Sequence, residues 1–231
     1  MASQPLEGVL LIDKPLNITS FGVIAALRRL TGIQKIGHCG TLDPLATGLL
    51  VCLVGKKFTR LSDSFLGARK AYVAQITLGS STTTYDAEGT LVEASSYIPT
   101  LDEIKTALEA FQGETLQTPP QFSAKKVGGV KACDAARAGK TVELKSQPVE
   151  MNIDLLGYEY PLVKLKVDCS KGTYIRSLAH DLGKKLSCHG HLSGLQRIQS
   201  GSFSLDQAIC LDKLKANPEL LHQFLNNKSY V

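Results

Sequence analysis

The residues best suited to chemistry lie in one short stretch, GHCGTLDPLATG, at positions 37–48. Its three glycines lack the Cβ atom that restricts the backbone, and Pro44 disfavours a helical conformation at Asp43. The stretch therefore predicts a shaped loop that presents one carboxylate. That carboxylate could act as a nucleophile or cap a helix that starts at the proline, and spacing alone favours the cap. His38, in the same stretch, fits either a base or a hydrogen-bonded structural residue.

A second stretch, CSKGTYIRSLAHDLG at 169–183, gathers basic and aromatic residues around a glycine turn that opens a predicted helix. These residues are Lys171, Tyr174 and Arg176. Such an arrangement suits an anion or a planar group. Spacing alone favours the simpler interpretation, a helix start with solvated basic side chains. By the same reasoning Tyr72 is predicted to be a half-buried strand aromatic, and Lys14 a turn lysine beside Pro15.

The cysteines and histidines do not form a recognisable metal-binding pattern. CHGH at 188–191 and HC at 38–39 supply suitable ligands, but zinc sites usually show paired ligands at a regular spacing, which these lack. The signatures of zinc nucleobase deaminases, phosphate-binding glycine loops and serine nucleophile elbows are also missing from the sequence. The sequence therefore predicts no metal site, and a metal enzyme is kept only as a competing hypothesis.

Length, charge and hydropathy limit the class of protein. The 231 residues suffice for one large or two small domains, and the hydrophobic content of 43% indicates a globular chain. The net charge of +5 permits a polyanionic partner, as do basic pairs such as Arg28/Arg29. No apolar run approaches the roughly 20 residues of a membrane helix, and the N-terminus lacks a secretory signal. We therefore expect a cytoplasmic protein that does not bind membranes.

Hydrophobic periodicity predicts an α+β fold, in which helices and loops flank a mixed, largely antiparallel central sheet. Strands are predicted at 8–13, 48–55, 70–79 and 192–204, with a hairpin at 151–170. Helices are predicted at 19–32, 56–66, 100–113, 130–139 and 174–187, and a long loop at 114–129. Thr19 or Ser20 is the expected N-cap of the first helix and Gly32 its end, and Thr100 with Glu103 is expected to form a capping box at the third. We expect residues 1–210 to form one domain and residues 211–231 to form a terminal helix or tail.

Several stretches, in this order along the chain, resemble one family. They are GVLLIDKPLNITS, GHCGTLDPLATGLLVCLVG, KAYVAQITLG, YDAEG, PPQFSAKKVGG, AARAG and CSKGTYIRSLAHDLG. Together they are similar to bacterial tRNA pseudouridine synthases of the TruB type, over about residues 8–203. The GH-x-G-x-LDPLATG and KGTYIR blocks are too long for a chance match.

This resemblance implies that residues 1–210 are a catalytic domain that isomerises uridine 55, in the T loop of tRNA, to pseudouridine. Asp43 matches the catalytic nucleophile of the family, Arg176 the arginine that pairs with it, and Tyr72 the tyrosine that stacks on the target uracil. The other matching residues are His38, behind the flipped base, Tyr174 and Leu195, in the pocket, and Lys14, which supports the site. The resemblance also implies that the reaction needs neither a metal nor an organic cofactor.

The chain departs from the family pattern at several positions. Cys39 stands where threonine is usual, Asn17 where glycine is usual, and Gln196 where arginine is usual. The chain also ends too early for the C-terminal RNA-binding domain of the PUA type that many relatives carry. We therefore expect a monomer that grips the T arm of tRNA without a protein partner, with the loop of Lys125 and Lys126 as a thumb over the RNA.

Two other RNA-related functions compete with this hypothesis. The same scaffold could be a non-catalytic tRNA-binding or tRNA-folding protein, but such a protein would not need the joint presence of Asp43, Tyr72, Tyr174 and Arg176. A related synthase could act on ribosomal RNA under the guidance of another RNA. That activity needs partner surfaces and usually the extra C-terminal domain, so the sequence favours the tRNA enzyme.

Overall fold

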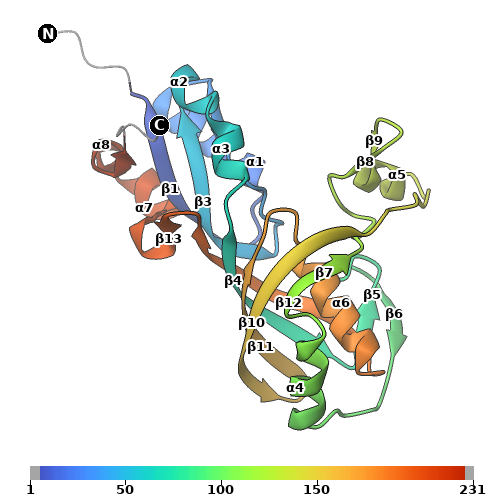
Figure 1. The fold of residues 1–231 in the computed structure, drawn as a ribbon. Coiled ribbons are helices and arrows are strands. Elements are labelled where there is room, and N and C mark those ends of the chain that lie inside the picture. The colour runs from blue at the N-terminus through green and yellow to red at the C-terminus, as the bar shows by residue number, and fades with distance from the viewer. Residues whose placement is uncertain (1–5, 227–231) are drawn as a thin grey trace, which may run out of the picture. The chain divides into compact units, whose positions relative to one another are not determined.

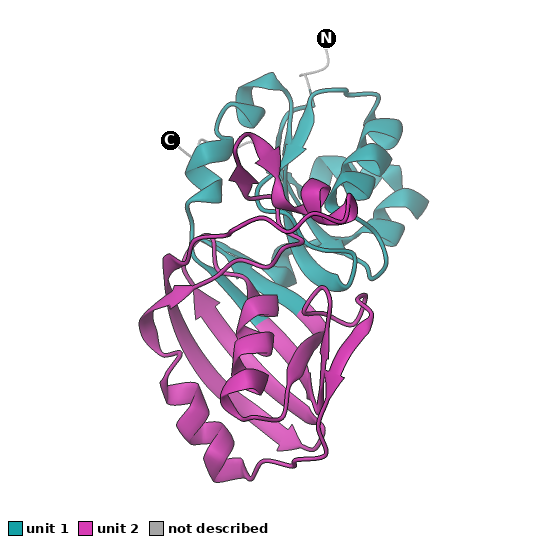
Figure 2. Cartoon of the chain, turned by 90° about the vertical axis from the view of Figure 1, so that its right-hand side faces the viewer, with its two compact units in different colours: residues 1–72, 196–231 teal, residues 73–195 magenta. Residues whose placement is uncertain are grey.

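The computed structural model describes residues 6–226, and the chain divides into two compact units. Unit 1 spans residues 1–72 and 196–231, and unit 2 spans residues 73–195, as the colours of Figure 2 show. The chain passes between the units twice, once within strand β4 (Lys70–Leu78) and once within strand β12 (Gly190–Ser200). Both strands therefore contribute residues to each unit.

Unit 1 is built on a sheet around the strands β1 (Gly8–Lys14) and β3 (Ala46–Val54). Its other elements are the strands β2 (Ile36–His38), β13 (Phe203–Ser204), β14 (Ile209–Cys210) and β15 (Leu225–Asn226), the helices α1 (Ser20–Thr31), α2 (Lys56–Thr59), α3 (Ser62–Leu66), α7 (Leu211–Ala216) and α8 (Leu221–Phe224), and 3₁₀ turns at Leu205–Gln207 and Pro218–Leu220. β1 pairs with β3, β14 and β15, whereas β2 pairs with β3. β1 and β3 are therefore the inner strands of this unit.

Unit 2 is built on the long hairpin of β10 (Gln147–Glu159) and β11 (Leu162–Cys169), which Figure 1 labels. β10 also pairs with β7 (Gly113–Gln117). Helix α4 (Leu101–Glu109) contacts both β10 and helix α6 (Ile175–Lys185). The remaining elements are β5 (Ser80–Thr82), β6 (Leu91–Ala94), β8 (Lys126–Val127), β9 (Val130–Lys131) and α5 (Ala132–Arg137).

The predicted α+β class, with a largely antiparallel sheet and flanking helices, is confirmed. The pairs β1–β3, β2–β3, β7–β10 and β10–β11 are antiparallel, whereas β1–β14 is parallel. In unit 1, side chains of α1 and α7 share a core with those of β1, and in unit 2 α4 lies against β10. Within residues 6–226 no helix is long and apolar enough to cross a membrane.

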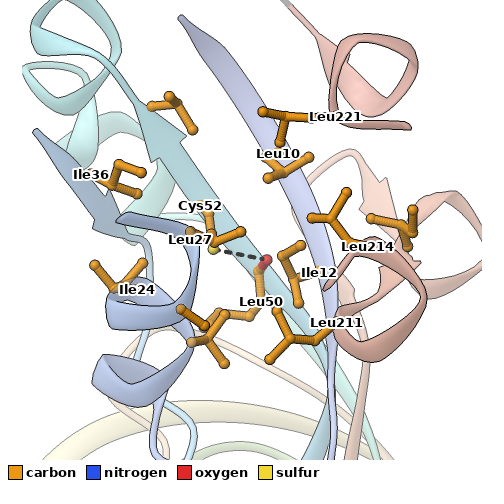
Figure 3. Close-up of a cluster of buried hydrophobic side chains, with 14 residues drawn as sticks. Leu10, Ile12, Ile24, Leu27, Ile36, Leu50, Cys52, Leu211, Leu214 and Leu221 are labelled. Atoms are coloured by element: carbon orange, nitrogen blue, oxygen red, sulfur yellow. Dashed lines mark hydrogen bonds between the residues drawn. The ribbon is translucent and has the colours of Figure 1, made fainter. Parts of the chain in front are cut away.

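The core of unit 1 follows from the two-residue period of its strands, which directs alternate side chains to opposite faces. On one face, Leu10 of β1 and Leu50 of β3 pack with Leu27 of α1 and with leucines of α7 and α8 (Figure 3). On the opposite face, Leu49 and Leu53 of β3 join a second apolar cluster. β3 is buried on both faces, which explains why its sequence is almost continuously apolar.

Two predicted helices are confirmed together with their caps. α1 begins after Thr19, whose hydroxyl accepts a hydrogen bond from the N–H of Gly22 at 2.9 Å, and it ends at Gly32 with φ 71°. α4 begins after Thr100, which forms the predicted capping box with Glu103. Because these ends are specified by hydrogen bonds within a few residues, local sequence predicts them well.

Two predicted elements are wrong in part. The predicted loop at 114–129 contains most of β7 and also β8. β7 forms because it pairs with β10, a distant partner that the local sequence does not indicate. The predicted helix at 56–66 consists of two short helices, α2 and α3, which a turn separates.

The predicted terminal tail contributes to the core of unit 1 over its described residues. Leu211, Leu214 and Leu221 are buried in the cluster of Figure 3, and Leu225 of β15 pairs with Leu10 of β1. The last part of this prediction, residues 227–231, lies outside the described residues. The segment 211–226 is therefore an integral part of unit 1.

We expect the loss of one core leucine to destabilise unit 1. Leu27 is fully buried in the cluster of Figure 3. Leu27→Ala should lower the free energy of unfolding by about 2–5 kcal/mol, because it leaves a cavity as well as removing buried apolar surface. Leu16→Ala, at a side chain that is 54% exposed, should change it by less than about 0.5 kcal/mol. Denaturant titration measures both values, and equal losses would contradict the described core.

Candidate active site

Asp43 lies in the connection between β2 and β3 and does not cap a helix. The connection turns at residues 44–45, where the N–H of Ala46 donates to the carbonyl of Asp43 at 3.0 Å, and β3 follows directly. The N-cap interpretation is therefore wrong. Residues 46–54 pair with β1 and β2, and this tertiary pairing outweighs the local Asp-Pro signal for a helix start. The half-buried aspartate thus sits on irregular backbone that needs hydrogen-bond partners from elsewhere.

The residue before the aspartate is fixed by helix α1. The buried hydroxyl of Ser20, at the start of this helix, accepts from the N–H of Leu42 at 2.8 Å. The same hydroxyl donates to the carbonyl of Leu42 at 3.0 Å. Because Thr19 caps the helix, the start of α1 is well defined, and it sets the position of Leu42 in turn.

The residue after the aspartate is fixed by the turn that follows β1. The carbonyl of Pro44 accepts from the N–H of Asn17 at 3.0 Å and from the ammonium group of Lys14 at 3.4 Å. Lys14 is completely buried and also donates to the carbonyls of Pro15 and Ile18. The interpretation of Lys14 as an ordinary turn lysine is therefore wrong. Its burial favours support of the loop over direct contact with a substrate.

Arg197 of β12 bonds to the loop and to the strand that follows it. Its side chain is buried, and its Nε atom donates to the carbonyl of Leu49, within β3, at 2.7 Å. Its Nη2 atom donates to the carbonyl of Gly40, near the start of the loop, at 3.0 Å. The planar guanidinium group holds these donors in fixed directions, so one side chain fixes the start of the loop relative to β3.

Contact with Arg197 explains two of the glycines in the loop. Gly48 has φ 94°, and a Cβ atom there would lie only 2.4 Å from the carbonyl oxygen of Arg197. Gly40 has φ 92°, and its Cβ atom would lie 3.2 Å from the guanidinium group. At Gly37 a Cβ atom would make only an ordinary contact, 3.8 Å from Thr59. Close approach to Arg197 therefore requires glycine at position 48.

His38 and Tyr72 are the other predicted site residues of unit 1, and both are half-buried. His38 ends β2, and its Nδ1 atom is buried without a hydrogen-bond partner among residues 6–226. Burial, with a smaller contribution from the positive charge of Arg197, lowers the pKa of His38. The imidazole is therefore neutral near pH 7.

In unit 2, Arg176 is a buried side chain in the first turn of α6. Its Nη1 and Nη2 atoms donate to the carbonyls of Thr84 and Phe122 at 3.3 and 3.0 Å. Its Nε atom lies 3.6 Å from the carboxylate of Asp86, which is also buried. The interpretation as a solvated basic side chain is therefore wrong for Arg176, whose guanidinium is oriented by three groups of its own unit.

Tyr174 is the N-cap residue of α6, and the side chain of Gln117 fixes its backbone. The amide oxygen of Gln117 accepts from the N–H of Tyr174 at 2.7 Å, and the amide nitrogen donates to its carbonyl at 3.1 Å. This pair of bonds sets the start of α6 and hence the position of Arg176. Leu195, the last predicted pocket residue, is half-buried in β12.

The seven predicted site residues divide between the two units. Unit 1 contains Lys14, His38, Asp43 and Tyr72, and unit 2 contains Tyr174, Arg176 and Leu195. Lys171, for which spacing favoured a solvated side chain over an anion ligand, is exposed. Within each unit the site residues therefore depend on a different set of supporting groups.

The residues of the competing metal hypothesis have other contacts. The Nδ1 atom of His189 lies 3.3 Å from the carboxylate of Glu93, and that of His191 lies 3.1 Å from the carbonyl of Ser80. Cys188 is a buried free thiol. In the part of the chain that the structure describes, no three side chains of His, Cys, Asp or Glu are grouped to hold a metal ion.

Comparison with known families supports the pseudouridine synthase hypothesis. Residues 28–175 match the N-terminal domain of the TruB family of pseudouridylate synthases, and residues 176–228 match the C-terminal domain of tRNA pseudouridylate synthase B. The chain belongs to the TruB family. A tRNA pseudouridine synthase B of Chlamydia trachomatis is 53% identical over 90% of this chain and 87% of its own length. One from Clostridium novyi is 44% identical over 90% of this chain and 72% of its own.

Solved structures support the same assignment. A chain of a Cbf5–Nop10–Gar1 complex is 30% identical, with a TM-score of 0.73, over 94% of this chain. A chain of an H/ACA RNP bound to a substrate RNA containing 2′-deoxyuridine is 28% identical, with a TM-score of 0.70, over the same share. This chain spans only 56% and 55% of those two chains, about half of their length. The likeness therefore concerns the shared fold.

Sequence reasoning missed the residues that support the site. Ser20 was predicted only as an alternative helix cap, and no supporting role was assigned to Arg197 or Gln117. One signal was available for Arg197, since a cation between strand residues must find buried partners. Nothing in the local sequence marks Ser20 or Gln117, because their partners are 22 and 57 residues away.

We expect Gly48 and Gly37 to respond differently to the same substitution. Gly48→Ala should lower the free energy of unfolding by at least about 2 kcal/mol, because the new Cβ atom meets backbone and φ is positive. Gly37→Ala, in the same stretch, should cost less than about 0.5 kcal/mol. Denaturant titration compares them, and a Gly48→Ala protein as stable as the parent would contradict the contact with Arg197.

We expect His38 to make stability depend on pH. Because the pKa of His38 in the folded state lies below the usual histidine value of 6.5, the unfolded chain takes up the proton first as the pH falls. The parent should therefore lose stability relative to His38→Gln below about pH 6.5 and not above it. Unfolding titrations of both proteins from pH 5 to 8 measure this difference, and a constant difference would contradict the lowered pKa.

Proposed function

We propose that this chain converts uridine 55 of the tRNA T loop into pseudouridine, with Asp43 as the catalytic carboxylate. The observation that carries the proposal is a TruB-family sequence whose Asp43 sits on a loop fixed on both sides, through Leu42 and Pro44. Relatives that are 53% and 51% identical over 90% of this chain are tRNA pseudouridine synthases. Both observations favour a tRNA-modifying isomerase over a folding helper, which would not need a positioned carboxylate.

The reaction is an isomerisation, so it needs no external electrons or atoms. The glycosidic N1–C1′ bond breaks, the uracil turns, and a C5–C1′ bond forms. C5 then loses its proton, and N1 gains one. The carboxylate of Asp43 attacks C1′, attacks C6, or assists elimination of the base, and each of these routes requires it to be ionised at the start.

The target base must leave its stack before Asp43 can reach it. We assign Tyr72 to stacking on the flipped uracil, a contact worth about 1–3 kcal/mol. Tyr174 and Leu195 line the pocket in this proposal, and the neutral ring of His38 packs behind the base. Half-burial of all four side chains supports these assignments, because each has both a packed and an accessible part.

Arg176 supplies the positive charge of the proposed site. A cation near a carboxylate favours its ionised form, so Arg176 keeps Asp43 ready to react. The contacts of Arg176 with Thr84, Phe122 and Asp86 support this role, because they give the guanidinium a defined orientation within unit 2. Lys14 acts through the loop, by holding Pro44.

The proposed working form is a cytoplasmic monomer that binds the T arm of tRNA without metal, cofactor or protein partner. All the proposed site residues lie within residues 1–210. The thumb over the RNA in this proposal is the loop of Lys125 and Lys126, together with the segment that follows it to residue 145. The exposed lysines of this region are Lys126, Lys131, Lys140 and Lys145, and basic side chains pair with phosphates.

The first test is pseudouridine formation on an unmodified T-arm hairpin by the parent and by Asp43→Asn. The parent should convert the loop uridine, whereas Asp43→Asn should lose at least about 1,000-fold in rate while it still binds the RNA. Asp63→Asn, at an exposed aspartate of the same unit, serves as the matched control and should keep parental activity.

Each outcome of this test has a distinct meaning. Product from the parent and from Asp43→Asn alike would remove Asp43 from the mechanism. Binding of the hairpin without product from any of the three proteins, on whole tRNA as well, would favour the folding helper. Activity on whole tRNA but not on the hairpin would keep the reaction and overturn recognition of the T arm alone.

A further inference from the structure

Arg176 holds the loop of residues 83–89, between β5 and β6, at two adjacent points. Its Nη1 atom donates to the carbonyl of Thr84 at 3.3 Å, and its Nε atom lies 3.6 Å from the carboxylate of Asp86. Tyr85 is the residue between these two points. Any change in the backbone at Tyr85 therefore moves both groups that orient the guanidinium.

Tyr85 has an unusual backbone conformation and a defined ring contact. Its φ angle is 63°, which is rare for a bulky side chain. Its ring stacks on that of His180, with centroids 3.9 Å apart and an interplanar angle of 9°. His180 lies four residues after Arg176 on α6, so both side chains project from the same face of the helix. α6 thus contacts this loop twice, one turn apart.

The backbone on either side of Tyr85 is fixed by β12. The N–H of Leu192 donates to the carbonyl of Tyr85, and the N–H of Ala87 donates to the carbonyl of Leu192, both at 2.9 Å. The hydroxyl of Thr82 donates to the carbonyl of Asp86 at 2.6 Å. A strained φ angle persists where the surroundings over-determine it, and here the strand fixes the backbone while the helix fixes the ring.

The ring stack does not depend on a charge. Burial, and then the positive charge of Lys184, lower the pKa of His180, so its ring is neutral near pH 7. Its Nδ1 atom is buried without a hydrogen-bond partner among the described residues. The ionisable groups around the pair are Lys184, His189, Glu93 and Asp181. The contact therefore works through packing, and an apolar ring could replace the imidazole.

We propose that Tyr85 and His180 are positioning residues that orient Arg176. Their stacked rings hold the loop against α6, and the carbonyl of Thr84 and the carboxylate of Asp86 thereby keep the guanidinium in one direction. This inference rests on the proposed function, in which Arg176 favours the ionised form of Asp43. Loss of the stack lowers the rate of the chemical step and leaves RNA affinity unchanged.

Substitutions at Tyr85 test this role. Tyr85→Asn removes the ring, whereas asparagine tolerates the positive φ angle, so its effect reports the loss of the stack and not an added backbone strain. It should lower kcat for pseudouridine formation about five- to tenfold, with less than about a twofold change in the Kd for T-arm RNA. Tyr85→Phe keeps the aromatic ring and should retain the parental kcat. Tyr97→Asn, at an exposed tyrosine of the same unit, should behave as the parent.

Substitutions at His180 and Asp86 test the same positioning role. His180→Ala should lower kcat as Tyr85→Asn does, whereas His180→Phe should retain it. In an Asp86→Asn background, Tyr85→Asn should cost at most about a further twofold, because one of the two groups through which the stack orients the guanidinium is already lost. Full additivity, parental kcat for Tyr85→Asn, or a weaker Kd with unchanged kcat would each overturn the inference.

Amide hydrogen exchange keeps this test separate from that of the proposed function. Tyr85→Asn should speed exchange at the amides of Ala87 and Leu192, which bridge the loop to β12, whether or not the parent makes pseudouridine. Unchanged exchange would overturn the role of the stack even in an active enzyme. An inactive parent with faster exchange in the variant would reject the proposed function and retain the loop contact.

Discussion

Irregular backbone beside a buried strand must find partners for its carbonyl groups, and in unit 1 the guanidinium of Arg197 supplies a donor to the loop that carries Asp43. Gly40, near the start of this loop, and Leu49, within β3, both accept hydrogen bonds from this side chain. An unpaired buried carbonyl would cost roughly as much as a lost hydrogen bond, so the loop is most stable in the one conformation that satisfies both. Gly48 follows from the same contact, since only glycine lets the strand approach Arg197 closely.

This way of holding the loop has an electrostatic consequence. The two partners of Arg197 described above are neutral carbonyls, so they satisfy its donors without cancelling its charge. The charge contributes to the lowered pKa of His38. A buried cation is costly to desolvate, and the hydrogen bonds to carbonyls offset part of that cost. Arg197 thus fixes backbone on both sides of Asp43 and retains its positive charge.

Local signals in the sequence predicted local features and failed where distant partners decide the structure. Thr19, Gly32 and the Thr100 capping box were predicted because the groups that they bond lie within a few residues. The helix cap at Asp43 was wrong, because β3 takes the residues that such a helix would use. The position of Asp43 on a loop, by contrast, followed correctly from its glycines and Pro44.

Local sequence also failed to predict the burial of two cationic side chains of the candidate site. Lys14 and Arg176 were expected to be solvated on spacing alone, since charged side chains are rarely fully buried. Their burial depends on carbonyls such as Pro44, 30 residues from Lys14, and Thr84, 92 residues from Arg176. Family resemblance could point to these residues as functional, but it could not say what holds them. That information appears only once the fold brings the carbonyls together.

Each unit contains a buried arginine that bonds to backbone carbonyls, but the two arginines have different roles. In each, an arginine is held by backbone carbonyls from distant segments, but Arg197 holds a loop, whereas Arg176 is itself held by one. A helix is stiff, so the start of α6 places the Cα atom of Arg176 accurately, whereas the long side chain still has several rotamers. The loop of Thr84 and Asp86 selects among those rotamers, and it can do so only if it is itself fixed. That requirement makes the residue between them, Tyr85, as consequential for the guanidinium as the groups that touch it.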